Sequence, residues 1–208
     1  MLGRTHFFIG TAAALAVLQP QTVPALVAGA GAAAIGGLIS DIDVGTSQAH
    51  RDADKIITAT VAVAVLTILA EYKLNLGIYR RLTSDSSVLR LLTGTAAFLL
   101  ICAYGKQQPH RSFMHSFAAL ALLTACVDII YPDASAYFAV GFLSHLVLDF
   151  FNRKPEKLFW PWKKGFCSAR GLVNRALLGC GMVSLAVVLV LSAPAGRLMA
   201  KIMRAIYG

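Results

Sequence analysis

Long apolar segments separated by short polar connections dominate this chain and restrict the folds open to it. A helix needs about 20 apolar residues to cross a bilayer upright, and shorter segments must extend, tilt or enter without crossing. Seven such segments occur, near residues 7–18, 24–40, 56–70, 88–104, 114–130, 136–151 and 176–193. We therefore predict an all-α, polytopic membrane helix bundle with about six or seven hydrophobic segments, forming a single domain over residues 1–208.

The composition supports a membrane protein. The chain is 57% hydrophobic and 14% charged, whereas soluble domains are about 45–50% apolar and about 25% charged. The N-terminal segment could pass for a signal peptide, but His6 at its start and the apolar chain that follows favour a membrane helix. The Gly/Ala-rich stretch "LVAGAGAAAIGGLIS" is typical of a helix that packs closely against its neighbours.

Cysteines and net charge exclude two other classes of site. The four cysteines show no CxxC spacing, so we interpret them as free, small apolar residues and expect no thiolate metal site. The net charge of +9 comes from basic residues spread over juxtamembrane loops, without the interleaved aromatics of a base-stacking surface. Contact with anionic lipid headgroups explains these residues, and we expect no nucleic-acid partner.

If all seven segments cross the membrane, the polar connections between them lie alternately on its two sides. All five histidines and the pair Asp41 and Asp43 then lie on, or at the edge of, one side. That side also holds twelve of the 19 Lys and Arg residues, so the positive-inside rule predicts that it is cytoplasmic. The segmentation used hydropathy alone, so the convergence of the histidines is an independent observation.

Two motifs place ionisable groups next to one another. His145 and Asp149 are i and i+4, so on a helix they share one face and could bind one metal ion or hydrogen-bond to each other. In "HRSFMHS", His110 and His115 are candidate metal ligands, and Arg111 could hold a phosphate or another oxyanion with its planar fork. The alternative is a loop histidine, an arginine at the lipid headgroups and a capped helix start.

Two further groups of candidate metal ligands give a weaker signal when each is considered alone. Asp41 and Asp43 end an apolar segment, where the helix dipole disfavours negative charge, so a bound cation would resolve the conflict. A solvated loop is the alternative for this pair, and an ordinary interfacial residue is the alternative for His6. Taken together, imidazoles and carboxylates on one membrane face without thiolates favour a divalent ion, with zinc expected and manganese or magnesium as alternatives.

The chain resembles the YdjM-like family, predicted membrane-bound metal-dependent hydrolases that are remotely grouped with zinc-dependent phospholipase C enzymes. The stretches "GRTHFFIG", "GGLISDID", "HRSFMHS" and "GFLSHLVLDFFNRKPEKLFWPW" carry the resemblance, from residue 3 to about 162. It implies a multi-pass protein of the bacterial inner membrane. It also implies these metal ligands: His6, Asp41, His110, His115, His145 and Asp149. The chain departs from the family pattern at Ser40, where proline is common, and after Asp149, where Thr and Gly often follow.

From these residues we expect hydrolysis of a phosphoester in a lipid or a similar amphiphile, with membrane lipid as both substrate and solvent. Asp43 or another free carboxylate of the set would accept a proton, Arg111 would hold a phosphoryl oxygen, and Ser116 would also contact the substrate. Two alternatives remain open at this point. One is a divalent-cation transporter or channel, and the other is a non-catalytic membrane protein with a structural metal site.

Overall fold

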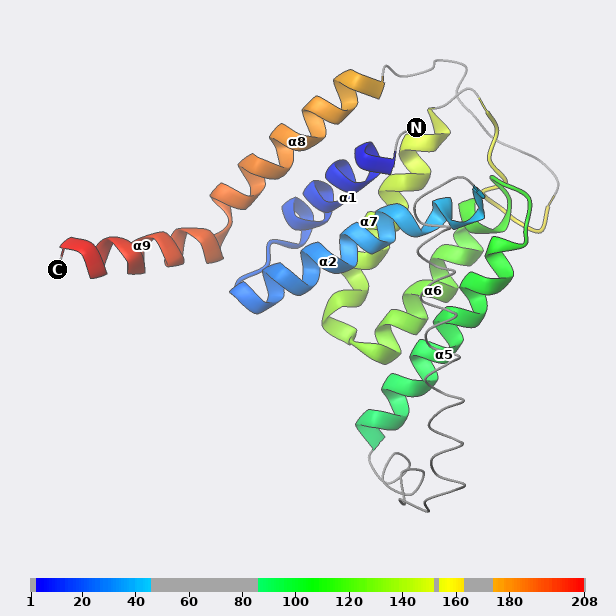
Figure 1. The fold of residues 1–208 in the computed structure, drawn as a ribbon, viewed down its shortest axis with the longest axis horizontal. Coiled ribbons are helices and arrows are strands. Elements are labelled where there is room, and N and C mark those ends of the chain that lie inside the picture. Colours follow the sequence, from blue (N-terminus) through cyan, green and yellow to red (C-terminus); the bar gives the residue numbers. More distant parts are fainter. Residues whose placement is uncertain (1–2, 46–85, 152–153, 163–173, 208) are drawn as a thin grey trace.

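The computed structural model describes residues 3–45, 86–151, 154–162 and 174–207 (Figure 1). The regular elements in these ranges are helices, which confirms the predicted all-α class. The α-helices are α1 (Gly3–Leu18), α2 (Val23–Ile39), α5 (Ser86–Lys106), α6 (Phe117–Ile130), α7 (Pro132–Phe150), α8 (Asn174–Leu191) and α9 (Ala193–Tyr207). Two 3-10 turns, η1 (Ser40–Asp43) and η2 (Phe113–His115), join them. The predicted segment 56–70 lies outside the described residues.

Local sequence explains where these helices begin. The side chain of Thr22 caps α2 by accepting a hydrogen bond from the Ala25 N–H, and a proline follows in the first helical turn. Ser116 caps α6 in the same way, so the segment predicted from residue 114 is α-helical only from Phe117. His115, which falls within the predicted segment, therefore precedes this cap and lies in the 3-10 turn η2.

Small residues let α2 and α7 pack in close contact, as the Gly/Ala-rich stretch predicts. A Cβ on Gly36 would collide with the backbone oxygen of Phe138, and one on Gly141 would collide with that of Ala33. Such collisions mean that the two helix backbones approach to a distance that a larger residue could not accommodate. This contact fixes the last turns of α2 against the middle of α7.

The other helices extend this pair into a bundle. Helix α5 runs antiparallel to α6, since Arg90 near its start donates a hydrogen bond to the Ile129 carbonyl and Gly105 near its end packs against Met114. Helix α8 lies along α1, where Gly181 meets Ile9. As a result, α1 and α6 begin where α2, α5 and α7 end. We call this end of the bundle the polar end.

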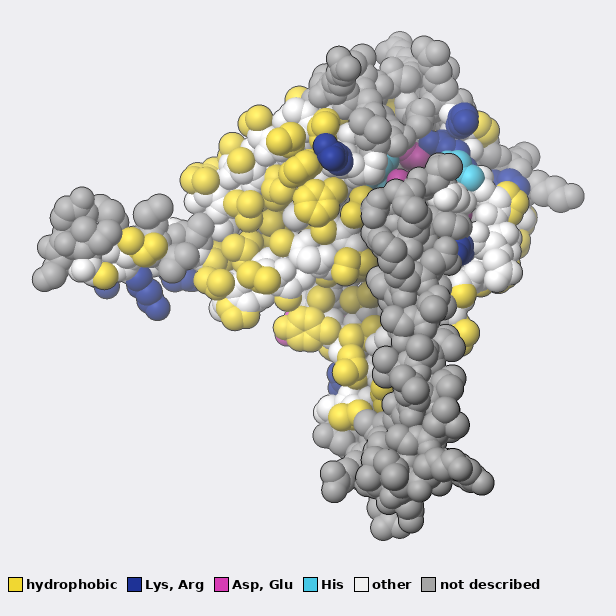
Figure 2. All heavy atoms as spheres, in the orientation of Figure 1, with side chains coloured by type: hydrophobic (Ala, Val, Ile, Leu, Met, Phe, Trp, Pro, Cys, Tyr) yellow, Lys and Arg dark blue, Asp and Glu magenta, His cyan; other side chains and the backbone are white. Residues whose placement is uncertain are grey.

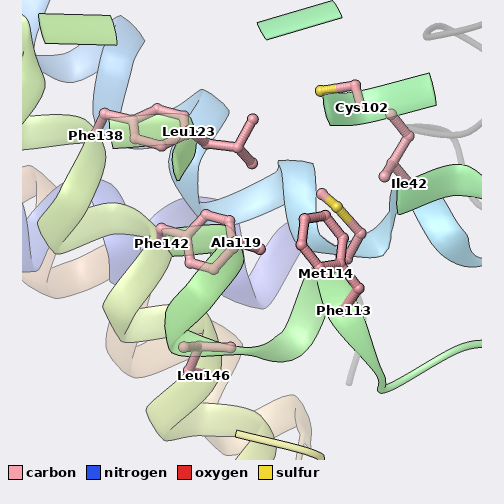
Figure 3. Packing of buried hydrophobic residues seen from close by; sticks show 9 residues of the cluster. All are labelled: Ile42, Cys102, Phe113, Met114, Ala119, Leu123, Phe138, Phe142 and Leu146. Atoms are coloured by element: carbon pink, nitrogen blue, oxygen red, sulfur yellow. The ribbon is translucent and has the colours of Figure 1, made fainter. Parts of the chain in front are cut away.

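A buried apolar cluster lies directly beneath the polar end (Figure 3). It consists of Ile42, Cys102, Phe113, Met114, Ala119, Leu123, Phe138, Phe142 and Leu146. Three of these residues adjoin the sequence motifs: Ile42 separates the two aspartates, Met114 precedes His115, and Leu146 follows His145. Packing of the cluster therefore fixes the backbone of each motif. Truncation of such a buried side chain typically costs about 2–5 kcal/mol.

The outside of the bundle is strongly apolar. Two stretches, Val23–Asp43 and Ser87–Lys106, are long and apolar enough to cross a membrane. Large apolar side chains are well exposed on several helices, among them Val17, Val27, Leu100, Val183, Val190 and Leu191. Figure 2 shows the result as a broad hydrophobic surface. A soluble monomer rarely exposes a continuous apolar surface of this kind, whereas hydrocarbon chains of a bilayer cover it without cost.

Candidate metal centre

Four segments that are distant in sequence bring ionisable side chains together at the polar end. His6 comes from the first turns of α1, Asp41 and Asp43 from η1, His110 and His115 from η2 and the turn before it, and His145 and Asp149 from the end of α7. The histidines at positions 6, 115 and 145 are fully buried, and Asp149 is 2% exposed. Burial of so many ionisable groups is costly unless they are paired or bind a metal.

The centre of this cluster is a pair of imidazoles. Nε2 of His145 lies 3.4 Å from Nε2 of His115. His145 directs Nδ1 to the Gly37 carbonyl oxygen at 2.8 Å, and a carbonyl only accepts, so the proton resides on Nδ1 and Nε2 presents a lone pair. Nδ1 of His115 lies 3.3 Å from Asp43 Oδ2, although the geometry is not that of a hydrogen bond. Because a carboxylate oxygen attracts a proton, this contact also favours the tautomer with the proton on Nδ1. With both protons on Nδ1, two lone pairs face each other across this contact, an arrangement that a cation between them would stabilise.

Carboxylates complete the surroundings of this imidazole pair. Asp41 Oδ1 lies 3.9 Å from His115 Nε2 and 3.8 Å from His145 Nε2, and Asp149 Oδ2 lies 3.7 Å from His115 Nε2. Ligand atoms about 2.0–2.1 Å from a tetrahedral ion are separated from one another by about 3.3 Å. The observed separations are close to this value, so a small shift of these side chains would suffice to bind a divalent ion.

His6 adds a third imidazole. Its ring stacks on that of His145 with a centroid separation of 3.9 Å, and its Nε2 lies 3.3 Å from Asp149 Oδ1. Neither ring nitrogen of His6 makes a hydrogen bond to any described residue, although the side chain is fully buried. A buried imidazole whose only close polar contact in the described part of the chain is a carboxylate oxygen at 3.3 Å is unusual, and a role as metal ligand would account for it. The chemistry of the whole set, imidazole nitrogen with carboxylate oxygen, fits zinc or a similar divalent ion.

Asp43 and His110 lie on the outer side of the imidazole pair. Asp43 Oδ1 is 2.8 Å from His110 Nδ1, and Asp43 Oδ2 accepts a hydrogen bond of 3.1 Å from the Arg111 N–H. Both carboxylate oxygens thus contact the "HRSFMHS" segment. The ligand atoms of Asp43, His110 and His115 are also close enough to share an ion. The His110 side chain is 39% exposed, so it forms the open edge of the cluster.

The structure places Arg111 differently from the expected oxyanion clamp. Its guanidinium is 7% exposed and contacts Asp149 Oδ2 at 2.6 Å, Glu156 Oε1 at 3.6 Å and the Lys154 carbonyl oxygen. Its backbone adopts a left-handed conformation with φ of 64°, which costs about 1–2 kcal/mol for a residue with a Cβ. The strained turn directs this side chain inward, toward Asp149.

Ser116, the other residue expected to contact substrate, makes hydrogen bonds within the protein. Its hydroxyl donates to the Phe113 carbonyl oxygen at 2.6 Å and accepts from the Ala119 N–H at 3.2 Å. The side chain is fully buried. Both functions of the hydroxyl therefore serve the backbone, and the geometry assigns Ser116 to capping α6.

Glu156 is a site residue that the sequence reasoning missed. It is fully buried, and neither carboxylate oxygen makes a hydrogen bond to a described residue. Burial, followed by the nearby Asp149 carboxylate, raises the pKa of Glu156 to about 8. Hydropathy gave no signal for this residue, because it lies among Lys, Arg and Pro in "FNRKPEK", a stretch that reads as a solvated loop.

Backbone contacts explain why this loop folds against the site. The Lys157 N–H donates to the Arg111 carbonyl oxygen at 3.0 Å, and the Phe117 N–H donates to the Leu158 carbonyl oxygen at 2.9 Å. A pocket elsewhere in the bundle, between the α1–α2 turn and the end of α8, contains no ionisable side chain in its lining. The buried His, Asp, Glu and Arg side chains of the described residues all lie at the polar end instead.

Comparison with known proteins agrees with the apolar character of the bundle. No curated protein and no solved structure matches the chain significantly. The family model described as "YdjM inner membrane protein" matches residues 1–207, which include every segment of the candidate metal centre. The chain therefore belongs to the YdjM inner membrane protein family.

Proposed function

We propose that this protein is a membrane-embedded, metal-dependent hydrolase that cleaves a phosphoester of a lipid or a similar amphiphile. The observation that carries the proposal is the pair of imidazole Nε2 atoms of His115 and His145, 3.4 Å apart, with carboxylates around them at the end of an apolar bundle. A divalent ion bound there would lower the pKa of water toward neutrality and polarise a phosphoryl oxygen. Zinc is the expected ion, with manganese or magnesium as alternatives.

The residues divide into two groups in this proposal. The ion would be held by His6, Asp41, His115, His145 and Asp149, with His110 as a further ligand at the open edge. Asp43 orients His115 and His110, since its oxygens face both rings. Of the three aspartates, Asp41 has the most exposed side chain, at 18%. We therefore assign to Asp41 the contact with the incoming water and its proton, in place of Asp43.

Arg111 has a positioning role in this scheme. Both terminal nitrogens of its guanidinium are directed at protein acceptors, and its Nε, which has no hydrogen-bond partner among the described residues, is buried, so the guanidinium does not present an open pair of donors to a substrate oxygen. By binding Asp149 Oδ2, the guanidinium fixes the orientation of that carboxylate toward the imidazoles. Such outer contacts typically change metal affinity or activity by about 10- to 100-fold.

The location of the cluster supports an amphiphilic substrate. Figure 2 shows acidic and histidine side chains reaching the surface beside the hydrophobic face of the bundle. A lipid could place its headgroup there without leaving the bilayer. A divalent-cation transporter would instead require ligands near the midplane with access from both sides, whereas these ligands gather at one end of the bundle.

The proposal includes a multi-pass topology with the polar end on the cytoplasmic side. It is supported by the apolar outer surface, by the alternation of the described helices and by the excess of Lys and Arg in the connections on that side. The two stretches that are long enough to cross upright would be joined by shorter helices that cross with the help of tilt or flanking residues.

The test combines metal content with turnover. Protein purified without chelator should contain a divalent ion and should release phosphate or a phosphorylated headgroup from one of a panel of phospholipids. Asp149→Ala should abolish both properties, while Asp133→Ala, at the exposed start of the same helix, should preserve them. Bound metal without turnover on any phosphoester would contradict the hydrolase and favour a structural metal site. Absence of metal would contradict the whole proposal.

A further inference from the structure

Helix α9 leaves the bundle at the end opposite to the candidate metal centre. It follows α8 after Ser192 and turns away from it, so that most of its length projects from the other helices (Figure 1). The end of α8 lies beside the α1–α2 turn, since Leu191 is close to Leu15 and Gln19. That turn is at the far end of α1 from His6. The hydropathy pattern did not predict α9, because basic residues interrupt its apolar residues too often for a crossing segment.

The charge pattern of α9 is one-sided. Arg197, Lys201 and Arg204 are spaced i, i+4 and i+7, so they form one stripe along the helix, and all three are exposed. Figure 2 shows basic side chains gathered along one side of α9. The helix contains no acidic residue that could neutralise this stripe. Its basic face is therefore available to an external anion.

The apolar residues of α9 lie opposite this stripe. Ile202 is 44% exposed, and its helical position is well separated from those of the basic residues. Among the described helices α9 alone is strongly amphipathic, whereas the apolar residues of the others are spread around the helix. A helix with one apolar face and a polar face rich in Lys and Arg typically lies in the plane of a membrane interface.

The neighbouring helix fixes the depth at which α9 lies. Val183, Val187, Val190 and Leu191 of α8 are well exposed, so lipid chains cover α8 up to its last residues. Helix α9 begins two residues after this apolar surface ends, which places it at the level of the headgroups. A symmetric contact between the basic stripes of two copies is disfavoured, because both stripes are positively charged.

We propose that α9 is an interfacial anchor that binds anionic phospholipid headgroups through Arg197, Lys201 and Arg204, on the membrane face opposite the candidate metal centre. The side that carries Ile202 rests on the upper acyl chains, and the aliphatic stems of the basic residues extend toward the phosphates. This inference concerns membrane attachment and does not depend on hydrolysis. An anchor of this kind would hold the tilt and depth of the bundle, and so of the polar end, relative to the lipid surface.

The test measures the surroundings of two positions on opposite sides of α9. In full-length protein whose native cysteines have been replaced, an environment-sensitive fluorophore is attached to Ile202→Cys or to the matched control Ala200→Cys, both at exposed positions. Each protein is placed in nanodiscs of phosphatidylcholine alone or mixed with phosphatidylglycerol. Lipids brominated in the upper acyl chain should quench position 202, and aqueous iodide should quench position 200.

Two further comparisons decide whether the headgroup charge matters. Quenching of position 202 by the brominated lipid should be stronger with phosphatidylglycerol than without it. The triple variant Arg197→Gln, Lys201→Gln, Arg204→Gln should lose this difference. Equal quenching in both lipid mixtures would overturn the headgroup assignment. Iodide access at position 202, or shielding of it from both quenchers as in a protein contact or a dimer, would overturn the interfacial helix itself.

Discussion

Nε2 of His115 and Nε2 of His145 face each other at 3.4 Å, although 30 residues of sequence separate them. On the other side of each ring, the Gly37 carbonyl oxygen lies at hydrogen-bond distance from Nδ1 of His145, and Asp43 Oδ2 lies 3.3 Å from Nδ1 of His115. Because both outer contacts are acceptors, they favour the tautomer of each neutral ring that carries its proton on Nδ1. In that tautomer the two facing Nε2 atoms carry the lone pairs through which imidazole binds a divalent ion.

Loss of one of these imidazoles should remove the metal. We expect His145→Ala or His115→Ala to lower the bound divalent ion to a small fraction of the wild-type level, since each deletes a ligand from the centre of the set. Inductively coupled plasma mass spectrometry of protein purified without chelator measures the content. Thermal unfolding with added zinc or manganese gives an independent reading, because ion binding stabilises only the folded protein. Unchanged metal content in both variants would contradict this assignment.

Gly37 offers a test of geometry with a control in the same helix. A Cβ at this position would lie 2.9 Å from the His6 carbonyl oxygen, so Gly37→Ala should push α1 away from α2 and displace His6. We expect metal affinity to fall by at least about 10- to 100-fold, the scale for disturbed outer contacts, because His6 is itself a proposed ligand. A Cβ at Gly31 would meet nothing within 4 Å. Gly31→Ala should keep wild-type affinity and raise stability by about 0.5–1 kcal/mol. Equal effects of the two substitutions would contradict the role of the close α1–α2 approach.

Much of the fold could be predicted from hydropathy. Apolar length identified the segments that became α1, α2, α5, α6, α7 and α8. The gathering of His6, His145 and Asp149 at one end followed from simple alternation of helices, because an antiparallel bundle returns every second connection to the same end. Hydropathy did not predict helix α9, because its apolar residues recur with helical periodicity and do not form a continuous run. A search for a period of 3.6 residues would have identified it.

The interior contacts of the site could not be predicted in the same way. The left-handed turn at Arg111 depends on tertiary contacts with Asp149 and the 154–162 loop, and no local signal marks it. The burial of Glu156 has the same origin, since its sequence neighbours are polar while the fold covers it. The positions of Arg111 and Glu156 depend on the three-dimensional path of a loop, which the hydropathy of the sequence does not predict.

Glu156 should make stability depend on pH in the metal-free protein. Its pKa is about 8 when folded and 4.5 in the absence of the fold, so between these values the folded state binds the extra proton. Stability should therefore fall as pH rises from about 5 to about 8, by at most about 1.4 kcal/mol per pH unit from this group. Glutamine has the shape of the protonated glutamate but does not titrate. Glu156→Gln should therefore remove the part of the pH dependence of stability that comes from Glu156. Thermal unfolding of both proteins in chelator measures it, and identical slopes would contradict the prediction.

The topology can be tested with single cysteines at exposed positions. Lys154 lies at the polar end and Asp133 at the opposite end of α7, and both are exposed. An impermeant thiol reagent applied to intact cells should label Asp133→Cys and leave Lys154→Cys unlabelled until the cells are opened. A cysteine at Gln48 should behave like the one at Lys154, although position 48 lies outside the described residues. Glu156 is unsuitable as a reporter, because burial would protect it on either side. Labelling of Lys154→Cys in intact cells would reverse the proposed orientation.

Arg111→Lys separates a positioning role from direct contact with substrate. The guanidinium bridges Asp149, Glu156 and the Lys154 carbonyl oxygen, and a single ammonium cannot reproduce this planar set of contacts. If Arg111 orients Asp149, the lysine variant should lose metal affinity by about 10- to 100-fold, and turnover should recover when metal is supplied in excess. If Arg111 instead gripped a substrate oxygen in the transition state, metal affinity would stay unchanged. Turnover would then fall by about 10²-fold or more at every metal concentration. Arg90→Lys, an exposed arginine at the start of α5, serves as the control and should change neither quantity.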